Sequence, residues 1–151
     1  MHVGVLSDTH GLLRPRVLER LAGCQHILHA GDVGDPTLLD RLRQIAPVTA
    51  VRGNVDAGLL ADMPWEAAGE LDGLAFRMVH RREDVPADWP RLAQLIVYGH
   101  SHRPEMTWHG SCLLLNPGAC GTRRFQLPLT VARLEVVDGG RRLIPEILAV
   151  E

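Results

Sequence analysis

Short apolar runs alternate with amphipathic stretches along the first third of the chain. Three runs have the length of buried strands, and they cover residues 2–7, 26–30 and 47–51. Pro15 is expected to open a helix after the first run, and Asp35 with Pro36 a second helix after the next run. The order β-α-β-α-β predicts a parallel sheet with crossover helices.

The second half of the chain has the pattern of three hairpins. They are expected over residues 67–80, 105–116 and 130–150, with turns at Asp72-Gly73, Gly110 and Gly139-Gly140. A short helix over residues 87–94 and a strand over residues 95–98 lie between the first two hairpins. We therefore expect one α/β domain over residues 1–151, mostly antiparallel in its second half. A single mixed sheet and two packed sheets both fit this pattern.

Composition narrows the class of protein. The 151 residues are 46% hydrophobic and 23% charged with a net charge of −2, which is typical of a globular domain and argues against long nucleic acid or a membrane surface as partner. All 16 cationic residues are arginine, which codon bias explains more simply than anion recognition. The three cysteines lack a C-x-x-C spacing, and neither a signal peptide nor a membrane span is recognisable, so we expect a cytoplasmic protein.

Polar side chains stand where five of the predicted strands end. The metal-ligand types among them are Asp8, His10, Asp32, Asn54, His80, His100 and His102. Because the carboxyl ends of neighbouring strands share one edge of an α/β sheet, these side chains are expected to meet. The two i, i+2 pairs would point to one side if their backbone is extended. Glycines before Asp32, Asn54 and His100 would allow tight turns and close backbone approach.

Seven donors are too many for one tetrahedral site and suit two metal ions bridged by a carboxylate. Paired ions about 3.5–4 Å apart are the arrangement that hydrolases use on phosphate esters. Oxygen and imidazole donors without thiolate favour Mn²⁺, Fe or Zn²⁺ over Mg²⁺ or Ca²⁺. A lone histidine in a loop would not indicate a metal site. Without a metal site, however, the metal-ligand residue at each of the five strand ends would need a separate explanation.

The motif series identifies a family that the chain resembles. Its fragments are V-L-S-D-T-H-G at the start, H-A-G-D, G-N-V-D, G-H-S-H and L-N-P-G at residues 115–118. In this order, over about residues 1–124, they resemble the calcineurin-like metallophosphoesterases, and most closely their small single-domain prokaryotic phosphodiesterases. Each fragment alone is a weak signal, whereas the ordered series is a strong one.

The resemblance implies an α/β/β/α sandwich, in which two packed mixed sheets are flanked by helices. It implies that one metal is held by Asp8, His10 and His102, and the other by Asn54, His80 and His100, with Asp32 bridging. The implied activity is hydrolysis of small or nucleotide-like phosphodiesters by a metal-bridging hydroxide. Asn54 and His10 are then the catalytic residues, with two Mn²⁺ ions as the preferred cofactor and Fe, Zn or Ni as alternatives.

Two departures from the family pattern concern the substrate. Val55 replaces the histidine that follows Gly-Asn in related phosphoprotein phosphatases, which leaves the proton donor to the leaving group unassigned. The sequence 80-HRRE-83 replaces the usual His-Gly-His, so that Arg81 becomes a candidate phosphate contact in a rather open site. Arg123, after the Asn-Pro-Gly turn, is a second candidate contact, and Arg124 beside it is an alternative.

Other polar residues have simpler interpretations. Asp35 is expected to cap a helix, Cys120 to be a packed thiol, and Ser101 to have no role. His29 and Asp56 could orient ligands, although His29 is more simply a hydrogen-bonded histidine in a strand. Two further functions remain open: a phosphomonoesterase, and a non-catalytic scaffold like the subunit of the same fold in the retromer complex. The scaffold is disfavoured because all seven ligand positions are filled. The sequence leaves monomer and homo-oligomer open.

Overall fold

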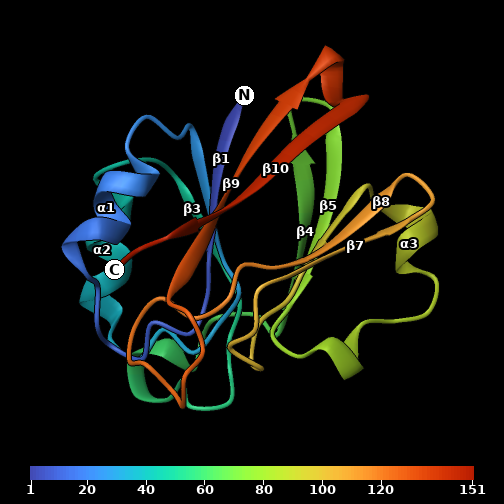
Figure 1. Ribbon diagram of the computed structural model, residues 1–151. Helices are drawn as coiled ribbons and strands as arrows, with labels where there is room; N and C mark the ends of the chain where they lie inside the picture. The colour runs from blue at the N-terminus through green and yellow to red at the C-terminus, as the bar shows by residue number, and fades with distance from the viewer.

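Two five-stranded sheets pack against each other in the computed structural model, which describes residues 1–151 (Figure 1). The strands are β1 (His2–Leu6), β2 (His26–His29), β3 (Val48–Ala50), β4 (Glu66–Leu71), β5 (Leu74–Val79), β6 (Leu95–Val97), β7 (Glu105–His109), β8 (Cys112–Asn116), β9 (Thr130–Val137) and β10 (Arg142–Ala149). The helices are α1 (Pro15–Leu21), α2 (Pro36–Arg43) and α3 (Trp89–Leu92), with 3-10 turns at Gly58–Leu60, Arg82–Asp84 and Asp138–Gly140. No helix has the length and apolar content needed to cross a membrane.

The first sheet has the order β10-β9-β1-β2-β3. β1 pairs in parallel with β2, and β2 with β3, as the alternating pattern of the first third predicts. Both helices between these strands cover the same outer face of the sheet (Figure 1). Pro36 opens α2 as expected, and Asp35 caps it by accepting a hydrogen bond from the Thr37 N–H.

The second sheet has the order β4-β5-β6-β8-β7 and is mixed. Its outer pairs are the two predicted hairpins, but β5, β6 and β8 run parallel to one another. The second half is mostly antiparallel, as expected, but the centre of this sheet is parallel because α3 carries the chain back between β5 and β6. The third hairpin, β9–β10, joins the first sheet through antiparallel pairing with β1. Two packed mixed sheets flanked by helices are the fold that the resemblance implies, and that prediction is confirmed.

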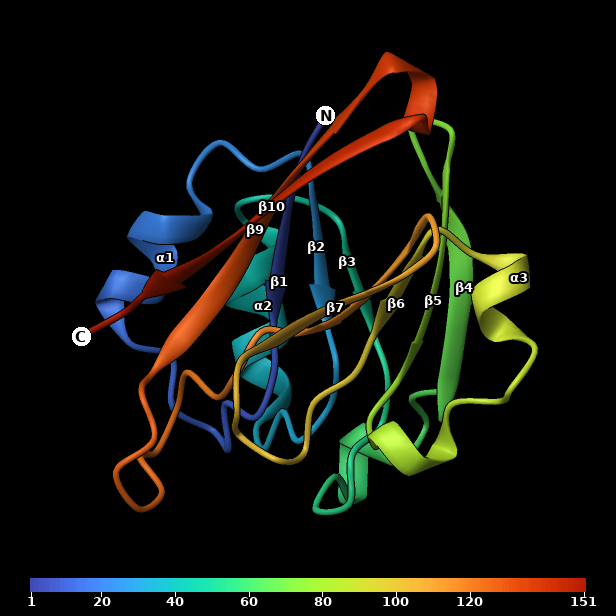
Figure 2. The ribbon, with the colours of Figure 1, turned by 45° about the vertical axis from the view of Figure 1, so that its right-hand side comes forward.

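Apolar side chains from the facing sides of both sheets form the central core, with Val5 of β1, Met78 of β5 and Val97 of β6 fully buried. A second cluster lies under α1 and α2 and includes Cys120, and all three cysteines are buried and unpaired, as expected. Each sheet buries its inner face against the other, which fixes their relative position. The loops that follow β1, β2, β3, β5 and β6 consequently gather along one edge, at the bottom of Figure 2.

Candidate metal centre

Six of the seven predicted ligands form two adjacent groups at this edge. Asp8, His10 and His102 make up the first group, and their donor atoms all lie within 4.8 Å of one another. Asp32, His80 and His100 make up the second group, with the same spacing. The imidazoles pair accordingly, since the ring centroids of His10 and His102 are 5.4 Å apart and those of His80 and His100 are 5.2 Å apart. The two close histidines of G-H-S-H thus belong to different groups.

The two carboxylates lie between the groups. Asp32 Oδ2 is 3.7 Å from His10 Nε2 and 3.2 Å from His80 Nε2, so it faces a histidine of each group. Asp8 Oδ1 is 3.3 Å from His102 Nε2 and 3.9 Å from His80 Nε2. Each carboxylate therefore faces a histidine of both groups, and the bridging role of Asp32 stays a prediction.

Hydrogen bonds orient these side chains from behind. Asp8 Oδ2 accepts hydrogen bonds from Ser7 Oγ at 2.6 Å and from the His100 N–H at 3.0 Å. Asp32 Oδ1 accepts one from the Val55 N–H at 3.0 Å. His80 Nδ1 lies 2.7 Å from the Ala30 carbonyl oxygen, to which it donates, so in the neutral ring Nε2 carries the lone pair and faces the centre.

The atoms that face the centre have no hydrogen-bond partner. Asp8 Oδ1, His10 Nε2 and His80 Nε2 are all buried and unpaired. Burying such polar atoms without a partner costs free energy, and native structures rarely do so without a functional reason. A carboxylate oxygen and imidazole nitrogens are ligands for divalent transition metals, so the residues present fit a metal pair at this position.

The electrostatics of the centre favour positive charge. Burial alone would raise the pKa of Asp8, but the imidazoles of His10 and His102 outweigh it and hold that pKa well below its usual range. Burial likewise opposes a lowered pKa at Asp32, where His80 and the Val55 N–H prevail. The pKa of His10 is raised chiefly by Asp8, and the pKa of His80 is raised by both carboxylates against the effect of burial. Two ionised carboxylates in a buried place attract cations.

The backbone at the ligands departs from what the sequence suggests. Five of the seven have positive φ: Asp8 at 55°, His10 at 47°, Asp32 at 55°, His100 at 74° and His102 at 64°. The expectation that extended backbone directs each i, i+2 pair to one side is therefore wrong, because left-handed turns aim these side chains instead. Non-glycine residues adopt such φ values uncommonly, and they cluster at functional sites.

Glycines allow the loops to approach one another, as expected. A Cβ on Gly53 would lie 2.2 Å from the Asp32 nitrogen and from Asp32 Oδ1. A Cβ on Gly99 would lie 2.1 Å from Ser7 Oγ and 2.7 Å from Asp8 Oδ2. No larger residue fits at either position without moving a candidate ligand or its hydrogen-bond donor.

His29 and Asp56 lie behind the centre and brace it. His29 Nδ1 accepts a hydrogen bond from the Gly31 N–H, so its Nε2 carries the proton and donates to Thr9 Oγ1 at 3.0 Å. Burial lowers the pKa of His29 to about 4, which keeps the ring neutral. Asp56 accepts hydrogen bonds from the Gly34 N–H at 3.1 Å and the Gly53 N–H at 2.8 Å, and so ties the loops after β2 and β3 together.

Asn116 braces the loop that carries His100 and His102. Its side-chain nitrogen donates to the Gly99 carbonyl at 3.2 Å and to Ser101 Oγ at 3.0 Å, and its Oδ1 accepts from the Gly118 N–H. Ser101 therefore has a structural role, contrary to expectation. Sequence reasoning missed this contact because the two segments meet only through the parallel pairing of β6 with β8.

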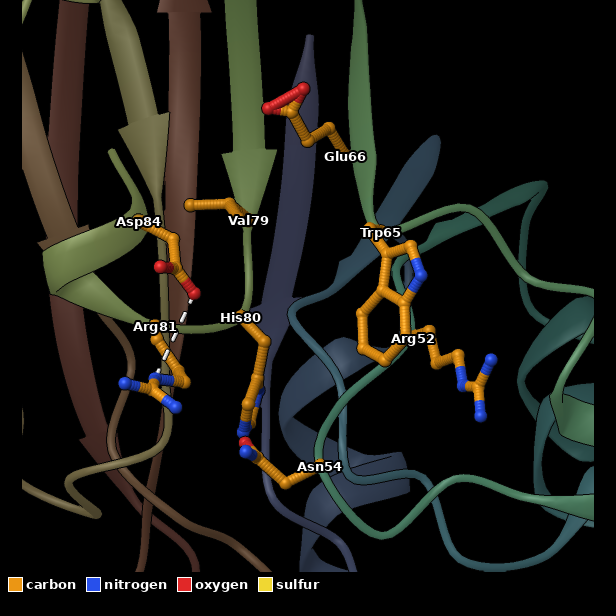
Figure 3. Close-up of a pocket in the computed structure, with 8 residues that line it drawn as sticks. All are labelled: Arg52, Asn54, Trp65, Glu66, Val79, His80, Arg81 and Asp84. Atoms are coloured by element: carbon orange, nitrogen blue, oxygen red, sulfur yellow. Dashed lines mark ion pairs between the residues drawn. The ribbon is translucent and has the colours of Figure 1, made fainter. Parts of the chain in front are cut away.

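The predicted substrate contacts lie in two cavities that flank the centre. The larger, of about 420 Å³, is lined by Asn54, His80 and Arg81 among others, and the exposed Asn54 side chain points toward His80 (Figure 3). Arg81 forms ion pairs with Glu83 at 3.2 Å and Asp84 at 3.7 Å.

The second cavity, of about 250 Å³, is lined by His10, His102, Thr122, Arg123 and Arg124. Arg123 forms an ion pair with Glu151 and donates a hydrogen bond to the Leu127 carbonyl. Arg124 lies close enough to oppose protonation of His10. An arginine thus stands beside the centre on each flank.

A family model described as a calcineurin-like phosphoesterase superfamily domain matches residues 1–139. A probable metallophosphoesterase of Methanothermobacter thermautotrophicus is 29% identical, with 98% of this chain and 92% of the relative covered. The phosphodiesterase YfcE of Escherichia coli is 30% identical, with 85% and 84% covered.

Two solved structures show the same fold. An archaeal phosphodiesterase superposes with a TM-score of 0.80 at 22% identity, covering 98% of this chain and all of that one. The zinc complex of Vps29 from Entamoeba histolytica superposes with a TM-score of 0.76 at 22% identity, covering both chains completely. The chain therefore belongs to the calcineurin-like phosphoesterase superfamily and is a phosphoric ester hydrolase, as its motif series predicts.

Proposed function

We propose that the chain is a dinuclear metal-dependent phosphodiesterase acting on small or nucleotide-like phosphodiesters. The observation that carries this proposal is a set of three buried atoms without a hydrogen-bond partner, which face one another beside the Asp32 carboxylate. They are Asp8 Oδ1, His10 Nε2 and His80 Nε2. Asp8, His10 and His102 would hold one divalent ion, and Asn54, His80 and His100 the other, with Asp32 shared. Such a pair supplies a nucleophilic hydroxide at neutral pH and charge stabilisation at the phosphoryl oxygens.

The residues of the chain would position the substrate around that centre. Asn54 is neutral, lines the larger cavity and can donate a hydrogen bond to a phosphoryl oxygen. His10 faces the smaller cavity with about a fifth of its side chain exposed, where it meets the other side of the phosphoryl group. Arg81 and Arg123 remain the proposed substrate contacts, one in each cavity, and Arg124 stands beside Arg123.

The position after Gly53-Asn54 offers the leaving group only the apolar Val55. The Val55 side chain has no ionisable group, and its backbone N–H, which donates to Asp32, is too weak an acid to protonate a leaving group. We infer that water protonates the leaving group, and that esters of acidic alcohols such as nitrophenol react fastest because their oxyanions need no proton. Mn²⁺ is our proposed metal, and the buried, unpaired cysteines fit the proposed cytoplasmic location.

The test combines hydrolysis with metal analysis. The purified protein is loaded with Mn²⁺ and assayed on bis(p-nitrophenyl) phosphate beside Asp32→Asn, His100→Ala and the control His109→Ala, whose histidine is exposed on β7. We expect the first two variants to lose activity and bound manganese, and the control to retain both. Full activity in both site variants would refute the proposal.

Assays on the same purified protein distinguish two alternative functions. A preference for p-nitrophenyl phosphate over the diester would make the chain a phosphomonoesterase and leave the metal centre unchanged. A scaffold would hydrolyse neither ester even when loaded with metal, because a protein of this fold can hold zinc, as the Vps29 complex does. The likeness to Vps29 concerns the fold alone and favours neither function.

A further inference from the structure

The larger cavity has an aromatic wall that the metal centre does not use. Strand pairing explains its position: Glu66 of β4 pairs with Val79 of β5, and the residues one step beyond this pair, Trp65 and His80, both line the cavity. Figure 3 shows the Trp65 indole on one side of the cavity and Arg81 on the other, with His80 and Asn54 between them. A group attached to a phosphate at the centre would lie in this cavity, within which the indole is the one aromatic wall.

The indole is held in place from one side. The guanidinium carbon of Arg52 lies 4.4 Å from the centre of the Trp65 ring, a stacking distance. Arg52 is itself fixed, because its Nε donates to the Asp56 carbonyl at 3.0 Å and its Nη1 donates to the Ala61 carbonyl at 3.3 Å. A guanidinium covers one face of the ring, yet Trp65 remains 57% exposed, so much of its surface is free to contact another planar group.

The remaining lining selects the kind of group. Trp65 and Val79 are the two hydrophobic residues of the cavity, and the rest are polar or charged, including Glu66 and Asp84. An acyl chain or a lipid would leave these polar groups without partners. A planar ring with hydrogen-bonding edges, in contrast, can stack on the indole and satisfy them. The volume of about 420 Å³ is within the range of small-molecule sites.

We propose that Trp65 is a specificity-determining residue that stacks on the aromatic arm of the phosphodiester, and that this arm is a nucleobase. This inference rests on the proposed function, because it places the phosphate at the metal centre. It narrows the substrate class from small phosphodiesters to nucleotidyl esters. Base–aromatic stacking tolerates every base, so Trp65 selects for an aromatic ring without selecting one sequence.

The experiment measures product binding to the Mn²⁺-loaded protein. Adenosine 5′-monophosphate and ribose 5-phosphate share a phosphate and a sugar, and only the first has a ring to stack. Their inhibition constants are measured against bis(p-nitrophenyl) phosphate hydrolysis, and their dissociation constants by isothermal titration calorimetry, with nucleotide quenching of tryptophan emission recorded beside them. The variants are Trp65→Ala, Trp65→Phe and the control Trp108→Ala, whose tryptophan is similarly exposed on β7.

We expect the wild-type protein to bind adenosine 5′-monophosphate about tenfold more tightly than ribose 5-phosphate. Trp65→Ala should remove this difference by weakening only the nucleotide, Trp65→Phe should keep most of it, and Trp108→Ala should leave it unchanged. Nucleotide quenching of emission should persist in Trp108→Ala and disappear in Trp65→Phe.

Equal affinity of the wild-type protein for the two products, or unchanged nucleotide affinity in Trp65→Ala, would overturn the inference. Either result with normal diester hydrolysis would leave the proposed function intact. Calorimetry reports binding of both products whether or not the diester is hydrolysed, so loss of the proposed function would be recognised separately.

Discussion

The carboxylate of Asp56 offers the sharpest test of how the metal-binding loops are held. It is 1% exposed and accepts hydrogen bonds from the Gly34 N–H and the Gly53 N–H, one from each of two loops. Asp56→Ala would remove both acceptors and leave two backbone donors unpaired. A hydrogen bond to a charged group contributes about 1.5–3 kcal/mol, so the two together contribute about 3–6 kcal/mol to the free energy of unfolding. For a chain of this size that corresponds to a fall of about 10 °C in Tm.

The same substitution should also reduce activity, because Gly53 precedes Asn54 and Gly34 closely follows Asp32. Loss of a residue that orients ligands lowers metal affinity or activity by about 10- to 100-fold. Asp56→Asn keeps one acceptor and should lie between Asp56→Ala and the wild-type protein in both properties. It also serves if Asp56→Ala does not fold.

Urea unfolding and kcat/KM on bis(p-nitrophenyl) phosphate are measured at one fixed Mn²⁺ concentration, because a ligand bound by the folded state alone adds to stability. Asp35→Ala is the matched control, since Asp35 also accepts two hydrogen bonds, both from Thr37, but does so at the surface. It should cost less stability and leave kcat/KM unchanged. A stability loss below about 1 kcal/mol in Asp56→Ala, or equal effects of the two substitutions, would refute this reasoning.

Three further predictions follow from named contacts. His29 is buried with a pKa of about 4, so between about pH 6.5 and 4 the unfolded chain binds a proton that the folded chain does not. The free energy of unfolding of the wild-type protein, relative to that of His29→Gln, should therefore fall by on the order of 3 kcal/mol from pH 7 to pH 4. A difference in urea unfolding that stays constant with pH would contradict this. Gly99→Ala should lower kcat/KM by about 100-fold or more, because the added Cβ would displace Asp8 or Ser7. Gly110→Ala, where a Cβ would lie in open space, should leave kcat/KM unchanged. Equal kcat/KM in the two variants would count against the close contact of Gly99 with Asp8 and Ser7. Ser7→Ala removes the 2.6 Å hydrogen bond to Asp8 and should weaken Mn²⁺ binding about tenfold in a chelator competition. The control Ser111→Ala, in the β7–β8 turn, should leave Mn²⁺ binding unchanged. Unchanged affinity in Ser7→Ala would show that Ser7 does not orient Asp8.

Local patterns in the sequence predicted the elements well, for a physical reason. An apolar run marks a strand because it reflects which faces of the strand are buried. Proline and aspartate mark helix starts because proline fixes its own φ angle and aspartate accepts hydrogen bonds from the first helical N–H groups. Every predicted strand and helix is present within a few residues. Which sheet the hairpin β9–β10 joins, and the parallel pairing of β5, β6 and β8, depend on contacts between distant segments that no local pattern encodes.

The sequence by itself determined which donors are available and that they stand at strand ends, because residue type and strand length are local properties. The tertiary structure decided how the donors are divided: His100 and His102 lie in different groups, whereas Asp8 and His10, which have the same spacing, share one group. It also decided the supporting contacts of Asp56 and Asn116, and the neighbourhood of Trp65 and His80. These depend on the packing of two sheets and on strand register, which arise only when segments far apart in the chain bury their apolar faces together.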